Sequence, residues 1–252
     1  MTKATADKAA EEPVPEQKPG IGTLNEKPLH AALKLWAAEP GDQFEVPLEG
    51  YFIDVVRGDL LQEALLIEIQ TGSFSPLKKK LRHLTKNHPV RLIYPIAAEK
   101  WLIQPPKLGF GKPTRRKSPK RGDVYLVFKE LVSFPDLIQS PNFSLQVVLT
   151  REEELRKFEA KTRRRRYQKQ WHLEERRLIE VVSSHLFEMV DDFRSLLPAA
   201  LPEQFTTKDI TALSGQPAWL IQKMVYCMRQ MGLIQLIGKQ GKFLLYEIVD
   251  VG

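Results

Sequence analysis

The sequence predicts an α+β fold, and three observations support that class. Near the N-terminus, Leu29, Leu33 and Trp36 recur at helical spacing. Short apolar runs bounded by turn residues then follow one another, as strands do. The part of the chain from residue 172 onward combines helical periods with a hairpin that contains two glycines. Helices and strands in this order indicate an α+β protein with more than one folded region.

The N-terminal elements are expected in the order helix, three strands, helix, strand, strand. Asn25 is a suitable N-cap for the first helix, which Pro40 and Gly41 end. Ser75 caps the second helix, residues 76–86, because a proline then occupies the favoured first position. The expected strands are residues 44–48, 50–57, 64–71, 90–94 and 100–103.

The middle of the chain is expected to change from loop to helix. Residues 105–122 are rich in proline, glycine and basic residues, which is typical of a loop. Residues 124–138 are expected to be helical with a break at a proline, and residues 143–149 to form a further strand. Thr150 then caps a charged helix over residues 151–169.

The C-terminal region is expected to hold three helices and a hairpin. The first helix carries an apolar stripe, the second begins at Thr206, and the third runs from Pro217 to Gly232. The runs that flank Gly238 and Gly241 alternate as the strands of a hairpin do. This order resembles a winged helix-turn-helix domain. The apolar stripe of the first helix comprises Leu178, Val181, Val182, Leu186 and Met189.

These elements divide the chain into four parts. We expect a disordered tail at residues 1–22 and a folded domain at 23–150. A basic helical linker is expected at residues 151–171 and the winged helix domain at 172–252.

Charge favours an anionic partner. The 252 residues carry a formal net charge of +7, and the excess is concentrated in two blocks. Residues 107–121 hold seven basic residues and no acid, and residues 161–169 hold six basic residues and no acid. Such blocks are typical of nucleic-acid or anionic-membrane contacts, although solvated loops can carry them too.

The setting expected from composition is the cytoplasm. Cys227 is the single cysteine, which excludes an intramolecular disulfide and a cysteine-rich zinc site. The N-terminal segment lacks the apolar core of a signal peptide, and no run is long enough to span a membrane. We therefore expect a soluble intracellular protein without a membrane partner.

Acidic and amide side chains interrupt two of the expected strands. Asp54 lies between Ile53 and Val55. Glu68 and Gln70 share one face of the next strand because strand side chains alternate. An unpaired carboxylate in an apolar strand is strongly disfavoured or becomes protonated, so two of them on neighbouring strands predict a cation.

The nature of that cation is open from the residues alone. A metal ion could lie between Asp54 and Glu68. The alternative is a structural ion pair with Arg57, Arg91 or a lysine of the following helix.

The spacing Asp-x13-Glu-x-Gln, followed by a lysine-rich helix, resembles the PD-(D/E)XK nuclease superfamily. The match is to the Glu-x-Gln branch typified by competence-associated nucleases, and it covers residues 24–149. Asp54 matches the first acid and Glu68 the second, while Gln70 stands where lysine is commoner. Ile53 also departs from the family pattern, which has proline there.

The resemblance implies a restriction-endonuclease-like αβββαβ core that cleaves DNA with Mg²⁺ or Mn²⁺. Asp54 and Glu68 would hold the metal, and Gln70 would orient the attacking water. Glu26 resembles the acid that the superfamily often places on its first helix, and His30 is the competing candidate one turn further along.

Basic side chains are expected to receive the phosphate backbone. In the second helix, Lys78 and Arg82 share a face and are preferred over Lys79 and Lys80. Further candidate contacts are Arg115, Arg116 and Lys117 in the first basic block, Arg164 and Arg165 in the second, and Lys223 and Lys239 in the winged helix region.

The sequence thus favours a Mg²⁺-dependent DNA endonuclease. One alternative is a nuclease fold without catalysis that acts, through its winged helix, as a DNA-binding regulator or adaptor. Another is a docking subunit, and the winged helix region could also mediate homo-oligomer formation.

Overall fold

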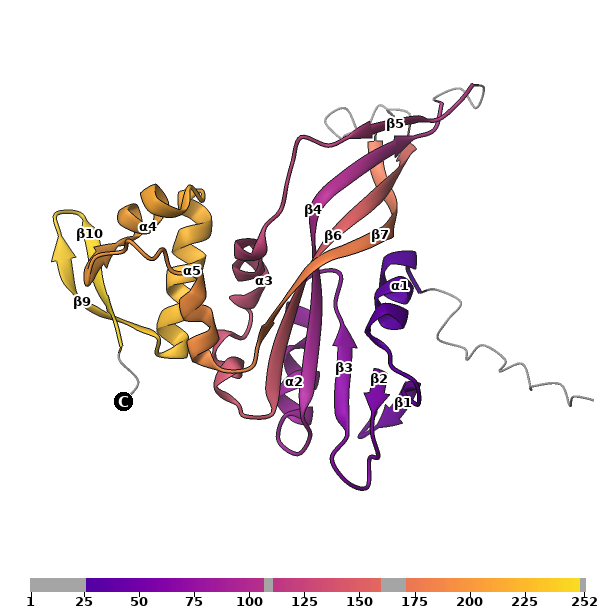
Figure 1. Cartoon of the computed structure of the whole chain (residues 1–252), viewed down its shortest axis with the longest axis horizontal. Coiled ribbons are helices and arrows are strands. Elements are labelled where there is room, and N and C mark those ends of the chain that lie inside the picture. The colour runs from indigo at the N-terminus through magenta and orange to yellow at the C-terminus, as the bar shows by residue number, and fades with distance from the viewer. Residues whose placement is uncertain (1–25, 107–110, 160–170, 250–252) are drawn as a thin grey trace, which may run out of the picture.

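The computed structural model describes residues 26–106, 111–159 and 171–249. Within those residues the chain has a mixed α+β fold, with a seven-stranded mixed sheet and a small three-stranded antiparallel sheet accompanied by helices (Figure 1). The α+β class expected from the sequence is confirmed.

The helices and strands fall into two groups, those of the large sheet and those of the C-terminal part. The large sheet and its helices comprise α1 (Pro28–Ala37), β1 (Gln43–Leu48), β2 (Tyr51–Arg57), β3 (Leu65–Ile69), α2 (Lys78–Leu84), β4 (Val90–Gln104), β5 (Thr114–Lys117), α3 (Phe128–Leu131), β6 (Phe143–Phe158) and β7 (Trp171–Phe187). The C-terminal part comprises β8 (Gln204–Thr206), α4 (Thr207–Ser214), α5 (Ala218–Met231), β9 (Ile234–Gln240) and β10 (Phe243–Ile248). Short 3₁₀ segments lie at Ser75–Leu77, Val124–Val127, Pro135–Gln139 and Val190–Leu196.

The large sheet has the strand order β1-β2-β3-β4-β6-β7, with β5 paired to β4. Its centre is parallel, because β4 runs parallel to both β3 and β6. Its margins are antiparallel, in the β1–β2–β3 meander and in the β6–β7 pair. Helix α2 makes the crossover from β3 to β4 that a parallel pair requires. Beyond this body, β4, β6 and β7 extend together as a long arm that carries β5 (Figure 1).

The two faces of the sheet are covered differently. Helix α1 buries Leu29 and Leu33 on one face against Val55, Ile67 and their neighbours. The opposite face packs against α2, α3 and the C-terminal part in one cluster of buried residues. The C-terminal helices therefore share their core with the sheet.

That shared core is continuous from the sheet to α5. Leu92 of β4, Phe128 of α3 and Phe134 belong to the same buried cluster as Met228 of α5 and Leu233. Gln139 Nε2 also donates to the Met231 carbonyl at 2.9 Å, at the C-terminal end of α5. Apolar burial of this kind is the main term that stabilises a fold.

The expected N-terminal elements are largely confirmed. The first helix, the three strands and the second helix lie within a few residues of their predicted positions. The two separate strands expected at 90–94 and 100–103 are instead one strand, β4, with an irregular register between Ala97 and Glu99. The helical segment expected at 124–138 consists of the short α3 flanked by 3₁₀ turns.

The charged helix expected at residues 151–169 is wrong for the residues that the structure describes. Strand β6 continues to Phe158 and crosses the domain boundary expected at residue 150. Its charges alternate across the strand, because Glu152 and Glu154 are buried while Arg151 and Glu153 are half-buried. The basic run at 163–166, with Arg164 and Arg165, lies outside the described residues, as does the tail at 1–22.

The helix expected around residues 178–189 is wrong as well, because these residues lie in β7 and at its end. β-Bulges explain the misleading period. Val181 pairs with Thr150 and Leu178 with Glu152, so Ile179 is an extra residue in the ladder. Leu178 and Val181 consequently pack against the same buried cluster although they are three residues apart. A bulged strand thus imitates helical spacing.

The remaining C-terminal elements follow the prediction. A capping box of Thr206 and Asp209 begins α4, and Gly215 ends it at a φ of 68°, where a side chain would be strained. Helix α5 ends at Gly232, and β9 and β10 form the expected hairpin. Strand β8 adds to β10 as a third strand. No helix in the described part of the chain is long and apolar enough to cross a membrane.

Candidate functional site

The candidate site lies where β2 and β3 separate. The two strands pair from Arg57 and Leu65 to Val55 and Ile67, and the ladder stops there. Asp54 is the next residue of β2, and its Oδ2 accepts a hydrogen bond of 2.8 Å from the Ile69 backbone N–H. A carboxylate thus takes the place of the strand carbonyl that would have continued the ladder.

Glu68 of β3 is buried beside this fork, with 3% of its surface exposed. The Lys80 ammonium of α2 lies 2.6 Å from Glu68 Oε1 and donates a hydrogen bond of 2.5 Å to the Phe52 carbonyl of β2. This buried Glu68 Oε1 has no hydrogen bond of standard geometry in the described part of the chain. Lys80 therefore bridges the two strands and opposes the negative charge of the Glu68 carboxylate.

The two carboxyl groups have different proton affinities. Burial raises the pKa of Glu68 from 4.5 to about 7, the Asp54 charge adds to this rise, and Lys80 opposes it. Burial acts in the same direction on Asp54, but the hydrogen bond and charge of His30 hold the pKa of Asp54 below its usual value. Near neutral pH, Asp54 is ionised and Glu68 is poised between its two forms.

The polar face of α1 supplies further charges. His30 Nε2 lies 3.3 Å from Asp54 Oδ2, and His30 Nδ1 lies 2.5 Å from Glu26 Oε1. Lys34 also contacts Glu26, at 2.7 Å, and it pairs with Glu45. Burial lowers the pKa of His30, but Asp54 and Glu26 outweigh it and raise that pKa to about 9. His30 is therefore an imidazolium at neutral pH.

The structure brings together some of the predicted site residues and separates others. Asp54 and Glu68 lie at the same fork, and Glu26 reaches it through His30. Gln70 is directed elsewhere, because its amide Nε2 donates to the Ser73 carbonyl.

The basic residue at the site differs from the expected ones. Lys78 is exposed, and Arg82 pairs with Asp136 at 2.6 Å, whereas Lys80 contacts Glu68. The positions of the leucines in α2 could have identified Lys80 as the site residue. Leu81 and Leu84 are buried, so Lys80 borders the apolar side that faces the sheet, and Lys78 and Arg82 lie on the other side.

The side chains at the fork could hold a metal ion only with a small number of protein ligands. Among the residues that the structure describes, no three His, Cys, Asp or Glu side chains lie together so as to hold a metal ion. Mg²⁺ needs only one or two carboxylates, because water and phosphate complete its shell. Asp54 and the unsatisfied Oε1 of Glu68 fit that requirement, but Lys80 already provides the cation that the sequence left as an alternative.

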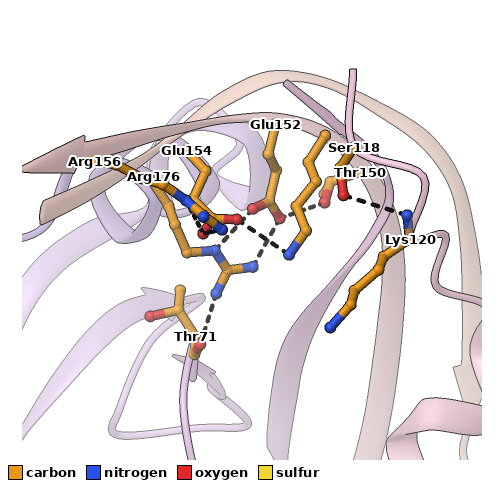
Figure 2. A network of polar contacts seen from close by, with 9 residues as sticks. Thr71, Ser118, Lys120, Thr150, Glu152, Glu154, Arg156 and Arg176 are labelled. Atoms are coloured by element: carbon orange, nitrogen blue, oxygen red, sulfur yellow. Dashed lines mark hydrogen bonds and ion pairs between the residues drawn. The ribbon is translucent and has the colours of Figure 1, made fainter. Parts of the chain in front are cut away.

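A second charged network was missed at the sequence level. Glu152 of β6 is 2% exposed and receives both Nε and Nη2 of Arg176, at 2.8 and 2.9 Å (Figure 2). Thr150 Oγ1 donates to Glu152 at 2.6 Å, and Arg176 Nη1 donates to the Thr71 carbonyl at 3.0 Å. The network thus links β6 and β7 to the chain just after β3. Because the second half of β6, from residue 151, and the residues of β7 were expected to be helical, their cross-strand pairs were not foreseeable.

The other predicted nucleic-acid contacts are distributed over the surface. Arg115, Arg116 and Lys117 lie exposed on β5. Arg115 and Lys117 flank the Trp101 ring, at 4.9 and 5.3 Å from its centroid. Lys239 is exposed in the β9–β10 hairpin.

Lys223 of α5 is half-buried. It lies on the same helix as the buried Cys227, a free thiol. Neither residue contacts the Asp54–Glu68 fork.

The fold and its ion-paired strand fork define a mixed α+β protein with a charged site between α1, α2 and the sheet. The family model "Domain of unknown function (DUF8091)" matches residues 27–188, from α1 to the end of β7, and the chain belongs to that family. The chain is also similar to an "Uncharacterized protein" of Treponema pallidum (strain Nichols), at 30% identity over 227 residues, covering 90% of this chain and 87% of the relative. No solved structure matches the chain.

Proposed function

We propose that this protein cleaves DNA phosphodiester bonds with Mg²⁺ or Mn²⁺ at the fork of β2 and β3. The observation that carries the proposal is the convergence of two carboxylates, the half-buried Asp54 and the buried Glu68, with the Lys80 ammonium. Buried acids with separated pKa values beside a lysine are typical of catalytic sites. The resemblance to PD-(D/E)XK nucleases supports the same assignment.

Each side chain has a role in this proposal. Asp54 and Glu68 would hold the metal, which lowers the pKa of a bound water and stabilises charge on the phosphate. His30 orients Asp54 through its ion pair. Lys80 would turn from Glu68 to the phosphate oxygens when the metal replaces it. Gln70 would orient the water after its amide leaves the Ser73 carbonyl.

The finer fold assignment is also a proposal. The order α1, β1, β2, β3, α2, β4 supports a restriction-endonuclease-like αβββαβ core. The order β8, α4, α5, β9, β10 supports a winged helix, in which the 3₁₀ turns at Val190–Leu196 would stand in place of a first helix. A DNA substrate would place the protein in the cytoplasm.

A second candidate function is a DNA-bound adaptor without cleavage. One observation favours it: the carboxylates at the fork are already compensated, Asp54 by His30 and Glu68 by Lys80. Such a closed ion network can serve as structure alone.

Cleavage assays on supercoiled and single-stranded circular DNA distinguish the two candidates. The nuclease proposal expects nicking by the wild type with Mg²⁺ or Mn²⁺, none with EDTA, and none by Asp54→Asn or Glu68→Gln. Glu49→Gln is the matched control, because Glu49 pairs with His83 and His88 away from the fork. If the folded wild type binds DNA but leaves both substrates intact with both metals, the cleavage proposal fails and the adaptor stands.

A further inference from the structure

A basic cleft lies between the arm of the large sheet and the start of α5. It encloses about 610 Å³ and is lined by residues of β4, β6, β7, α3, α5 and the segment before α3. Its charged and aromatic lining includes Lys100, Lys120, Lys129, Arg176 and Trp219. This volume is within the range of ligand sites in proteins.

A second cavity continues the cleft along the arm. It encloses about 330 Å³, shares Lys100 and Lys120 with the first cavity, and adds Arg116 and Arg156. Because the two cavities share lining residues, they lie next to each other along the arm, and together they are called the groove here.

The charge of this groove is strongly one-sided. Glu154 is the acid that lines it, and Lys100 and Arg156 already pair with that carboxylate, at 3.1 and 2.9 Å. Glu152, which lies next to the groove lining, accepts hydrogen bonds from both Nε and Nη2 of Arg176. The acids of the groove are therefore fully compensated by part of its basic lining.

Other cations in the groove remain available to a ligand. Within the described ranges, the Lys120 ammonium has no hydrogen bond or ion pair, and Figure 2 draws no contact from it to the Glu152 network. The Arg121 side chain is largely exposed and lies 3.7 Å from the Glu99 carboxylate. The Lys129 side chain is also exposed, and its ammonium lies 3.1 Å from the Glu130 carboxylate. Positive side chains that line a concave cleft with walls of low dielectric constant attract polyanions.

An aromatic surface accompanies these charges. Trp219, in the first turn of α5, is 48% exposed, and Leu173 of β7 is 55% exposed on the same cleft. Exposed apolar side chains beside lysines and arginines provide a base-stacking platform next to phosphate contacts. A free phosphate or an acidic peptide would not use the indole ring in this way.

We propose that this groove binds single-stranded DNA, with bases against Trp219 and phosphates against Lys120, Lys129 and Arg121. A duplex keeps its base faces stacked inside the helix and could not place them on the indole ring. The wall of the groove contacts the chain just after β3, because Arg176 donates to the carbonyl of Thr71, three residues after Glu68 of the proposed cleavage site. The inference extends the proposed cleavage by naming the form of the substrate, yet binding requires neither Asp54 nor a metal.

Fluorescence anisotropy with a labelled oligo(dT) strand in EDTA tests the proposal independently of cleavage. Lys120→Glu/Lys129→Glu should weaken binding at least about tenfold, and the slope of log K against log salt should flatten by roughly 0.7 per lost phosphate contact. Trp219→Ala should weaken binding about five- to tenfold, and Trp219→Phe should largely restore it. Circular dichroism and thermal unfolding verify that each variant is folded.

Two lysines outside the groove offer a matched control of equal charge change. Lys27→Glu/Lys86→Glu alters two exposed lysines of the sheet domain and should change affinity by less than about twofold. The proposal is overturned if this control loses as much affinity as the groove variant. It is also overturned if duplex DNA binds as tightly as the single strand, or if Trp219→Ala binds as the wild type does.

Discussion

Lys80 of α2 and Glu68 of β3 form a buried ion pair of 2.6 Å at the point where β2 and β3 separate. Their contact links α2, the crossover helix, to β3, one of the two strands that separate at the fork. The Lys80 side chain is 15% exposed and that of Glu68 is 4% exposed, so neither charge can be solvated in full. The stability and the chemistry of the site both depend on this pair.

Lys80→Met should destabilise the fold in a pH-dependent manner. Loss of the ammonium leaves the Glu68 carboxylate buried and unpaired, which costs about 1–3 kcal/mol above neutral pH. At pH 5 the loss should be smaller, because Glu68 can take up a proton. Urea unfolding at pH 5 and pH 8 measures both values. An equal loss at the two pH values would show that Glu68 does not titrate in the folded protein.

Glu68 should make the folded protein less stable as pH rises from about 4.5 to about 7. The pKa of Glu68 is raised in the folded state, so the folded protein binds more protons in this window than the unfolded chain does. The stability that protonation provides is present below about 4.5 and is lost as pH rises through about 7. Glu68→Gln should remove this component, which amounts to at most about 3 kcal/mol. Denaturation midpoints of both proteins across the window test it.

His30 should stabilise the folded protein, and this stabilisation should be lost between pH 6.5 and about 9. Its pKa is raised from 6.5 to about 9 by the two carboxylates that it contacts, so the contribution is complete below 6.5 and is lost as pH rises through about 9. His30→Gln should therefore destabilise the protein strongly at pH 6 and little at pH 10. NMR titration of the His30 ring gives a direct check, and a midpoint near 6.5 would contradict the expected ion pairs.

The Glu152–Arg176 pair should tolerate joint removal better than the loss of one partner. Arg176→Met leaves a carboxylate that is 2% exposed without its cation, and this should destabilise the fold by about 3 kcal/mol. Adding Glu152→Gln should recover most of that loss.

The neighbouring Arg177 provides the control for this experiment. It is 57% exposed and pairs with the half-buried Glu175, so Arg177→Met should change stability by less than about 0.5 kcal/mol. Urea unfolding of the four proteins measures the comparison. If the double variant is no more stable than Arg176→Met, the pair is not the source of the effect.

The sequence allowed the first half of the fold to be predicted because its local signals agree with its packing. Proline and glycine punctuate the N-terminal helix and strands, and apolar runs mark their buried faces. The convergence of Asp54 and Glu68 followed from their places on neighbouring strands. The choice of Lys80 required the rotation of α2 relative to the sheet, which the buried leucines of that helix indicate.

The second half illustrates where local patterns mislead. Strand β7 contains extra residues at three register shifts, so its apolar side chains lose the period of two that marks a strand. Strand β6 carries dense charge because its partners Arg176 and Arg177 lie across the ladder, not along a helix. Such pairs become visible only once the strands are known to be neighbours, and so the Glu152 network and the basic cleft could not be foreseen.

The core that the sheet shares with α5 makes the two parts of the chain one cooperative folding unit. Met228 and Leu233 belong to the same buried cluster as Phe128 and Phe134, although the family match ends at residue 188. A fragment cut at that residue would expose this apolar surface to water and should aggregate. The intact chain should unfold in a single transition reported alike by tryptophan fluorescence and by the loss of sheet, so that damage anywhere in α5 weakens the strand fork as well.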